Sequence, residues 1–255
     1  MKREKKNYAN SPSTEETIFR SNNAADSIYF SHPNKDINNR NIFIFKVILV
    51  GDGGAGKTSI FDRFTTNSFS DNFSCTMKVD YKVKSIVIDK DNIVDLQVWD
   101  TCGQEKYKTV TRSYYRNNNG CIIVFDITNK ESYNNVVNWY NDLKEFGQKG
   151  QTIVLVGNKK DLSEKREVYF KEIDELASRL NLTYIEISAK TGENVMHLFE
   201  YIALKFLKKE EYLRQIPENS NYSTSNVMRN SITLDKTLHS DKFQKNEKSK
   251  IKNCC

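Results

Sequence analysis

Residues 42–58 read Ile42-Phe43-Ile44-Phe45-Lys46-Val47-Ile48-Leu49-Val50-Gly51-Asp52-Gly53-Gly54-Ala55-Gly56-Lys57-Thr58. The first part of this stretch is almost entirely apolar, which is typical of a buried strand. The second part matches G-x-x-x-x-G-K-[ST], in which glycines let successive backbone N–H groups turn inward around a chain of phosphates. A helix is expected to begin near Lys57, and the positive end of its dipole favours an anion there. The order of strand, loop and helix therefore predicts a nucleotide-binding protein.

The phosphate-binding loop assigns roles to individual side chains. Lys57 is expected to reach the outer phosphates, and the Thr58 hydroxyl is expected to ligate Mg²⁺. The residues predicted to contact phosphates at this loop are Gly53, Gly54, Ala55, Gly56, Lys57, Thr58 and Ser59.

Composition limits the class of protein. The 255 residues are enough for one domain with tails or for two small domains. A net charge of +6 is too small to argue for a nucleic-acid partner, and none is expected. The five cysteines show neither metal-ligand spacing nor the density of a disulfide framework. No run of apolar residues is long enough to span a membrane.

The chain divides into three parts that differ in residue composition and hydrophobic pattern. Residues 1–40 are rich in Asn, Ser, Lys and Asp, and we predict a disordered extension there. Residues 41–210 alternate between strand-like and helix-like patterns and form the predicted domain. Residues 211–255 are polar, with lysines toward the end, and are expected to form a flexible tail.

The middle part predicts an α/β fold of the phosphate-loop nucleoside triphosphatase type. Strands that alternate with helices imply a mostly parallel sheet covered on both faces. A turn at 89–92 joins two strands into a hairpin, so one edge strand is expected to be antiparallel. We expect a six-stranded sheet and five helices. The predicted strands are 43–50, 79–88, 93–99, 120–127, 153–157 and 183–187, and the helical stretches are 57–65, 132–146, 170–180 and 195–209.

Two segments at the ends of neighbouring strands indicate which base is bound. Asn158-Lys159-Lys160-Asp161 follows the fifth strand, where ligands bind in open α/β sheets. Asp161 can accept hydrogen bonds from the N–H and the amine of guanine, whereas adenine would leave a buried Asp161 unpaired. Asn158 is expected to brace the loop, and the Lys159 stem can lie along the base. By itself this short motif fits a polar surface loop equally well.

The second segment shifts the balance toward guanine. Ser188-Ala189-Lys190 follows the sixth strand, and the Ala189 N–H is expected to point at the guanine carbonyl oxygen. Phe69, in the polar loop after the first helix, could stack on the base, although a core role for it is almost as good an interpretation.

The stretch Trp99-Asp100-Thr101-Cys102-Gly103-Gln104-Glu105 carries the predicted hydrolytic chemistry. Asp100 closes the third strand and is expected to hold Mg²⁺, and Thr76 could supply a second hydroxyl. The Gly103 N–H can approach the terminal phosphate because no side chain blocks it. Gln104 is expected to orient the attacking water.

Taken together, these motifs give a resemblance to the Ras superfamily of small GTPases and, within it, to the Rab family. The phosphate loop, Thr76, the 100–104 stretch and the two base segments occur in the family's order and close to its spacing. Further Rab-like features are Val79-Asp80-Tyr81, Leu96-Gln97-Val98-Trp99-Asp100, residues 105–111, Ser113-Tyr114-Tyr115-Arg116 and the final Cys254-Cys255. The resemblance covers about residues 42–210 and the last two residues.

The resemblance implies a switch that binds GTP or GDP with Mg²⁺ and hydrolyses GTP, regulating vesicle and membrane traffic. The terminal phosphate would order residues 67–78 and 101–116, and hydrolysis would release them. Effectors would read a surface that includes Phe73, Tyr81, Trp99 and Tyr114, although core packing explains Trp99 about as well. The resemblance also implies an exchange factor, a GTPase-activating protein, a dissociation inhibitor and an escort protein, and a monomeric chain.

Cys254 and Cys255 are predicted to be prenylated, as this ending is in Rabs. Two prenyl chains anchor a protein where one does not, and the nearby lysines favour an anionic leaflet. The expected location is the cytoplasmic side of an intracellular membrane, with cycling through the cytosol. The alternative is a solvated basic tail with unmodified thiols.

Two departures from the family pattern leave rival interpretations open. Cys102 stands where the family usually has alanine, and Lys78 stands where Rabs usually have glycine. They suggest as one rival a GTP-bound scaffold that hydrolyses slowly or not at all. An ATP-using phosphotransferase on the same fold is the other rival, and the guanine segment argues against it.

Overall fold

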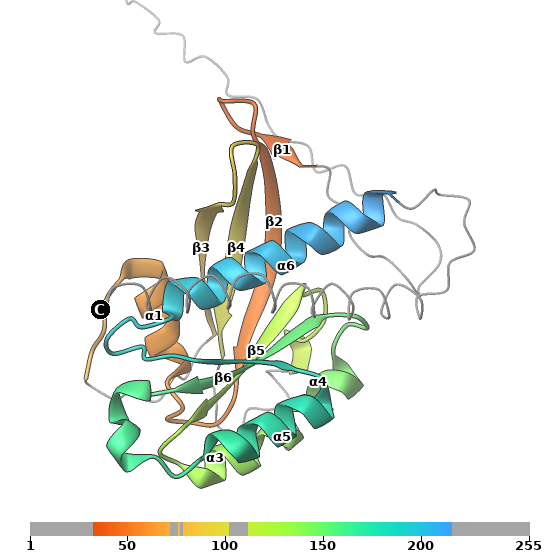
Figure 1. The fold of residues 1–255 in the computed structure, drawn as a ribbon. Coiled ribbons are helices and arrows are strands. Elements are labelled where there is room, and N and C mark those ends of the chain that lie inside the picture. The colour runs from red at the N-terminus through yellow and green to blue at the C-terminus, as the bar shows by residue number, and fades with distance from the viewer. Residues whose placement is uncertain (1–32, 72–75, 77–78, 102–111, 216–255) are drawn as a thin grey trace, which may run out of the picture. The chain divides into compact units, whose positions relative to one another are not determined.

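The computed structural model of the chain describes residues 33–71, 76, 79–101 and 112–215. A sheet of seven strands forms its centre, in the order β3-β4-β2-β5-β6-β7, with β1 paired to β2 (Figure 1). The pairs β3–β4 and β1–β2 are antiparallel, and all the others are parallel. The strands are β1 (Asn34–Lys35), β2 (Asn41–Val50), β3 (Asp80–Val87), β4 (Asn92–Asp100), β5 (Gly120–Asp126), β6 (Thr152–Asn158) and β7 (Thr183–Glu186). The predicted α/β fold is confirmed, but the sheet has seven strands instead of the predicted six, because β1 is added to it.

Helices cover both faces of the sheet. They are α1 (Lys57–Thr66), α3 (Lys130–Asn134), α4 (Val136–Phe146), α5 (Phe170–Leu180) and α6 (Val195–Gln215), with a short 3-10 helix, η2 (Lys160–Lys165). Side chains of α1 and α6 share one core cluster with the sheet, and side chains of α3, α4 and α5 share the other. Successive residues of a strand point to opposite faces, so in β2 Leu49 lies in the first cluster and Ile48 in the second.

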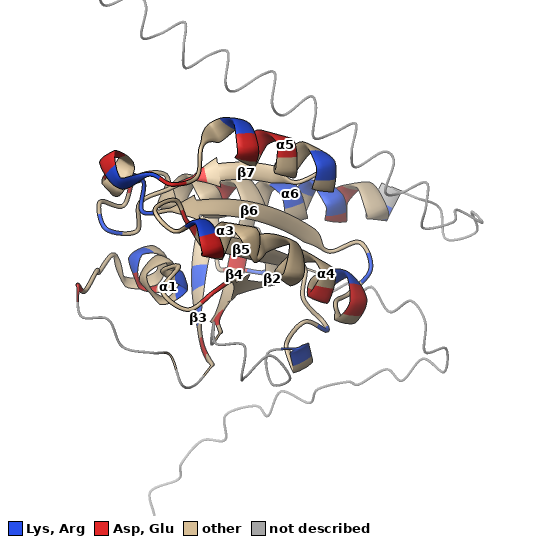
Figure 2. Ribbon diagram, turned by 90° about the horizontal axis from the view of Figure 1, so that it is seen from below, with Lys and Arg blue, Asp and Glu red and all other residues tan. Residues whose placement is uncertain are grey.

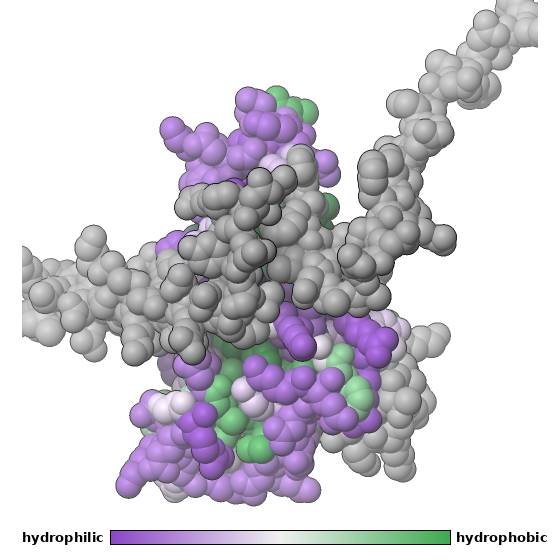
Figure 3. Space-filling view, turned by 90° about the vertical axis from the view of Figure 1, so that its right-hand side faces the viewer, coloured by the Kyte–Doolittle hydropathy of each residue, from purple (hydrophilic) through white to green (hydrophobic). Residues whose placement is uncertain are grey.

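The charge distribution follows this layering. Strand β6 has no Lys, Arg, Asp or Glu, and β5 has only Asp126 at its end. Figure 2 shows the charged residues gathered mainly on the helices and loops around these strands. On the face in Figure 3 most of the described surface is hydrophilic, as expected where helices turn polar sides to solvent. Among the described residues no helix is long and apolar enough to cross a bilayer.

The folded part begins before the predicted boundary at residue 41. Asn34 and Lys35 form β1 and pair with Ile42 and Asn41 of β2. The Asp36 carboxylate closes the connecting turn by accepting the backbone N–H groups of Asn38 and Arg40. Because this hairpin is almost entirely polar, its sequence has no hydrophobic alternation that would have predicted a strand.

Two predicted helices have different bounds in the structure. The predicted helix 132–146 is divided at Asn135 into α3 and α4, and it starts earlier because the Asn129 side chain caps the N–H of Ser132. Helix α6 continues past residue 209, where Arg214 pairs with Glu210 and lies 5.0 Å from the centre of the Phe43 ring.

The topology places the candidate residues at one edge of the sheet. Parallel strands β2, β4, β5, β6 and β7 all end on the same side, and ligands of open α/β sheets bind outside such carboxyl ends. The phosphate-binding loop follows β2, while Asp100, Asp126 and Asn158 are the last residues of β4, β5 and β6.

Candidate nucleotide-binding site

At two positions of the loop after β2, a positive φ and a close neighbour together require glycine. Gly51 has φ 136°, and a Cβ there would lie 2.1 Å from the Val124 carbonyl oxygen. Gly56 has φ 91°, and its Cβ would lie 2.3 Å from Nδ2 of Asn158. Larger residues would therefore force the loop away from β5 and from the end of β6. The glycines of the motif are explained by close packing as well as by phosphate binding.

Lys57 begins α1 and closes the loop on itself. Its ammonium group donates to the carbonyl oxygens of Gly51 and Asp52, at 2.8 and 2.9 Å. Asp52 is held in turn by α4 and its N-cap residue. The Asp52 carboxylate accepts hydrogen bonds from Trp139 Nε1 and from Nδ2 of the N-cap Asn135, each at 2.7 Å. A buried cation enclosed by a rigid loop is a site that favours an anion.

Three oxygen-bearing side chains meet beside the loop, as the sequence predicts. The hydroxyl oxygens of Thr58 and Thr76 lie 2.7 Å apart, and the Thr58 hydroxyl donates to Asp100 Oδ2 at 2.7 Å. The other carboxylate oxygen, Oδ1, is buried and has no hydrogen-bond partner in the described part of the chain. Burial raises the pKa of Asp100 to about 6, although the Thr58 hydrogen bond and Lys57 act in the opposite direction.

These residues fit a Mg²⁺ ion. Hard oxygen ligands suit this cation, which is often held by one carboxylate together with phosphate oxygens and water. No cluster of three or more His, Cys, Asp or Glu side chains in the described ranges could hold a metal. A Mg²⁺ ion here would therefore depend on Asp100, the threonine hydroxyls and the bound phosphates.

Asn158 joins the phosphate loop to the segment after β7. Its Nδ2 donates to the Ala55 carbonyl at 2.9 Å, and its Oδ1 accepts the Ala189 N–H at 3.1 Å. The bracing role predicted for Asn158 thus appears as a direct bridge. The Ala189 N–H, which the sequence analysis directs at the guanine carbonyl, is bonded to Asn158 in the structure.

Asp161 and Ser188, from the two predicted base segments, contact each other, but Asp161 is not buried. The Ser188 hydroxyl is fully buried and donates to Asp161 Oδ1 at 2.6 Å. The Asp161 side chain itself is exposed. The expectation of a buried Asp161 therefore does not hold for the chain alone, because the residue lies in η2 at the surface, beyond the end of β6.

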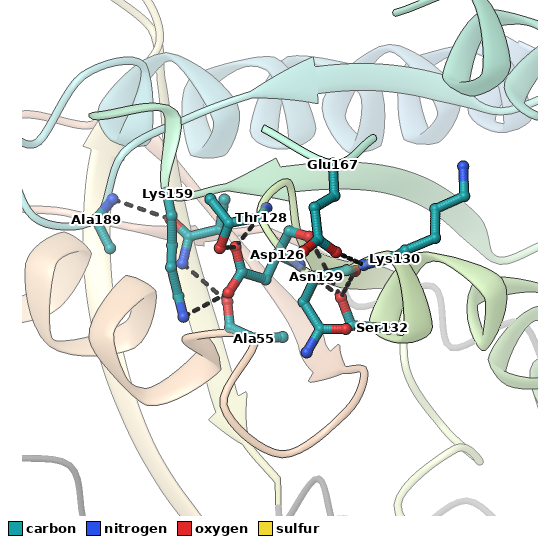
Figure 4. A network of polar contacts seen from close by, with 10 residues as sticks. Ala55, Asp126, Thr128, Asn129, Lys130, Ser132, Lys159, Glu167 and Ala189 are labelled. Carbon is teal, nitrogen blue, oxygen red and sulfur yellow. Dashed lines mark hydrogen bonds and ion pairs between the residues drawn. The ribbon is translucent and has the colours of Figure 1, made fainter. Parts of the chain in front are cut away.

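Lys159 is held by a contact that the motif does not predict. Its ammonium lies 2.6 Å from Asp126 Oδ2, and the second oxygen of Asp126 accepts from the N–H and the hydroxyl of Thr128 (Figure 4). The Lys159 backbone is left-handed, with φ 67°. These contacts hold the Lys159 side chain against the end of β5.

Phe69 and Lys190 lie near each other at the side of the site. Phe69 is half-buried and belongs to neither core cluster, so the core interpretation is not supported. The Lys190 ammonium lies 5.9 Å from the centre of the Phe69 ring and 3.1 Å from Asp71 Oδ1.

Three of the predicted effector-contact residues form an aromatic cluster. The rings of Tyr81 and Trp99 stack with centres 4.7 Å apart, and Tyr114 lies 5.5 Å from Trp99. Lys46 covers the Trp99 ring at 4.3 Å. Tyr81 is 53% exposed, whereas Trp99 is half-buried and packs against the core on the α3, α4 and α5 side. Trp99 therefore has a core role as well as a surface role.

Of the remaining predicted residues, Ser59 is described, and it is half-buried in the first turn of α1. The others fall outside the described ranges. The residues outside are Phe73, Lys78, Cys102, Gly103, Gln104, Cys254 and Cys255.

Comparison with known proteins gives one family and many relatives. The sequence model of the Ras family matches residues 46–208, which run from within β2 into α6. The chain is 40% identical to Ras-related protein Rab-1 of Theileria parva over 210 residues, covering 80% of this chain and 94% of the relative. It is 41% identical to Ras-related protein RabC of Dictyostelium discoideum over 160 residues, covering 62% and 82%. It is 35% identical to GTP-binding protein ypt1 of Schizosaccharomyces pombe over 185 residues, covering 72% and 87%.

Proposed function

Since the chain belongs to the Ras family, and within it to the Rab small GTPases, we propose that the site at the carboxyl edge of its sheet binds GTP and GDP together with Mg²⁺. The protein is a GTPase that acts as a switch in vesicle traffic. The residue assignments, the metal, the lipid anchor and the partners below are our proposals.

The observation that carries the proposal is the Asn158 bridge. One buried side chain bonds both the loop suited to phosphates and the segment suited to a base. A nucleotide carries a phosphate group and a base on one sugar, so a direct link between the segments suited to each favours a nucleotide over a simple anion.

The phosphate end is bound by the loop amides and by Lys57. The residues that would contact phosphates are Gly53, Gly54, Ala55, Gly56, Lys57, Thr58, Ser59 and Gly103. Thr58, Thr76 and Asp100 would hold Mg²⁺, which when bound neutralises charge on the phosphate oxygens. Asp100 Oδ1 has no hydrogen-bond partner among the described residues, and the Thr58 hydroxyl contacts both Asp100 Oδ2 and the Thr76 hydroxyl, which supports this assignment.

The base end is recognised by the segments after β6 and β7. Asp161, oriented by the Ser188 hydroxyl, would accept from the guanine N–H and amine. Phe69, Lys159 and Lys190 would flank the base, with Asn158 and Ala189 fixing the backbone around it. An adenine base would offer no donors to Asp161, which favours guanine nucleotides.

Gln104 would orient the water that attacks the terminal phosphate, with the Gly103 N–H close to that phosphate. The Thr76 hydroxyl already contacts Thr58, so Thr76 would be able to respond to the terminal phosphate. Ordered and released states of residues 67–78 and 101–116 would then be read by effectors at Phe73, Tyr81, Trp99 and Tyr114.

Single-turnover phosphate release from the GTP-loaded chain tests the hydrolytic assignment. We expect slow intrinsic release, increased by a factor of about 10³ to 10⁵ by an activating protein. Intact GTP binding without any release, with or without activator, would instead favour the slow or non-hydrolysing scaffold suggested by Cys102 and Lys78. Displacement of bound GDP by excess ATP would favour the phosphotransferase.

Membrane attachment through Cys254 and Cys255 completes the proposal. Prenylation there, aided by an escort protein, would place the chain on the cytoplasmic side of an intracellular membrane, and a dissociation inhibitor would return it to the cytosol. We expect a monomer that also meets an exchange factor and an activator. Intact-mass measurement of the protein from a prenylating cell should show two added isoprenoid groups, and an unmodified C-terminus would refute the anchor.

A further inference from the structure

Arg63 lies in the last turn of α1 and reaches the segment that follows β7. Its guanidinium donates to two consecutive backbone carbonyls of that segment, from Nε to Ala189 at 2.9 Å and from Nη2 to Lys190 at 2.7 Å. Its Nη1 donates to the backbone and side-chain oxygens of Asn67, at 3.0 and 3.2 Å. One side chain therefore joins the end of α1, at Asn67, to the segment after β7, at Ala189 and Lys190.

These contacts complete the support of Ala189. Its N–H is bonded to Asn158 Oδ1, and its carbonyl oxygen is bonded to Arg63. The preceding residue is Ser188, whose hydroxyl orients Asp161. A displacement of this segment would move the Ser188 hydroxyl and release the Asp161 carboxylate from its position.

Arg63 also contacts Asn67, the first residue after α1. Asn67 caps α1 in a left-handed conformation, with φ 53°, and its N–H donates to the Arg63 carbonyl. A second bond joins the same two regions, since the Lys190 ammonium pairs with Asp71. The segment proposed to recognise the base is thus tied to Asn67 and Asp71, which follow α1.

We propose that Arg63 is a positioning residue for base recognition, which holds the base segment against the end of α1 at Asn67. This inference rests on the proposed guanine-binding function. The planar guanidinium offers several N–H donors in a fixed arrangement, which suits acceptors on different segments. Lysine has a compact ammonium group on a flexible stem and cannot reproduce that arrangement.

The alternative is that Arg63 only caps the carboxyl end of α1, where basic side chains often bond the last carbonyls. Arg179 provides a matched control, because it is also in the last turn of a helix, α5, that ends in a left-handed asparagine. Arg179 is exposed and lies on the opposite face of the sheet from α1.

The experiment uses the full chain with Arg63→Ala, Arg63→Lys and Arg179→Ala. It measures the dissociation rate of GDP, the affinity ratio for GDP over inosine diphosphate, and the thermal midpoint. Inosine lacks the amine that Asp161 would accept from, so the ratio reports the position of that carboxylate. We expect GDP to dissociate about tenfold faster from Arg63→Ala, with a GDP preference reduced by about threefold or more. Arg63→Lys should show most of both effects, and Arg179→Ala neither.

Unchanged GDP dissociation in the Arg63 variants would overturn the inference. Faster dissociation with an unchanged GDP preference would also overturn it, because a general loss of stability affects both nucleotides alike. If Arg63→Ala does not fold, Arg63→Lys decides by the same criteria. A wild-type chain without affinity for GDP would refute the proposed function itself, and this outcome is distinct from those two.

Discussion

Replacing Asn158 by alanine removes the bridge between the phosphate loop and the base segment. The Asn158 side chain is 1% exposed and makes two hydrogen bonds to backbone groups of buried residues, Ala55 and Ala189. The substitution leaves a buried carbonyl and a buried N–H without partners, at about 1–3 kcal/mol each. Allowing for relaxation, we expect the free energy of unfolding to fall by about 2–4 kcal/mol. For a domain of this size that is a decrease of about 5–15 °C in the melting temperature.

Urea denaturation monitored by tryptophan fluorescence measures this loss. The concentration of free GDP must be equal for each variant, since bound ligand itself adds stability. Asn138→Ala is the control, because Asn138 is exposed and its amide donates to Asn135 Oδ1, at the start of α4, at a distance of 3.2 Å. The control should change stability by less than about 0.5 kcal/mol. An equally small effect of Asn158→Ala, with GDP affinity unchanged, would refute the bridging role.

Three further predictions address hydrolysis, a buried ion pair and a buried thiol. Gln104→Leu should bind GTP normally yet release phosphate far more slowly with an activator present, and normal activated turnover would disprove the role of Gln104. Arg166 donates from Nη2 to Glu186 Oε1 at 2.6 Å and from Nη1 to Glu186 Oε2 at 3.1 Å, and the two side chains are only 12% and 8% exposed. Because Arg166→Ala would leave the buried Glu186 charge without its partner, it should lower the free energy of unfolding by about 3–5 kcal/mol. The double variant Arg166→Met with Glu186→Leu should regain most of that loss, and equal losses in single and double variants would contradict this account. Burial raises the pKa of Cys121 above its ordinary value of 9.0, so its contribution to stability should be present below that pH and fall as the pH rises further. Cys121→Ala should show a smaller fall in urea stability above pH 9.0 than the wild type, and an identical fall would show that this thiol does not contribute.

Local patterns predicted most of the fold. The apolar run before the phosphate loop became β2, and the periodic stretch 170–180 became α5 with the same bounds. The polar hairpin around Asp36 was not predicted, because side-chain hydrogen bonds rather than hydrophobic burial shape its turn. The division of one predicted helix at Asn135 was also missed, since both halves continue the same apolar face.

The candidate site was predictable where a motif specifies chemistry. The Thr58 hydroxyl contacts both Thr76 and Asp100, as expected for side chains predicted to share one cation. The supports of the site were not predictable. The ion pair of Asp126 with Lys159 and the hydrogen bond from Arg63 to the Ala189 carbonyl join distant segments of the chain. Nothing in the sequence around Asp126 or Arg63 indicates these contacts. Only the folded chain shows which charged side chains meet these loops.

Base selectivity of Asp161→Asn measures whether this carboxylate reads the purine. Xanthine has an oxo group where guanine has its amine, and an asparagine amide can donate to that oxygen as the aspartate accepts from the amine. Affinities of the wild type and the variant for GDP and xanthosine diphosphate, with magnesium supplied, decide the matter. The wild type should prefer GDP, and the variant should prefer xanthosine diphosphate. A variant that still prefers GDP, or a wild-type chain that binds neither guanine nucleotide, would contradict the assignment.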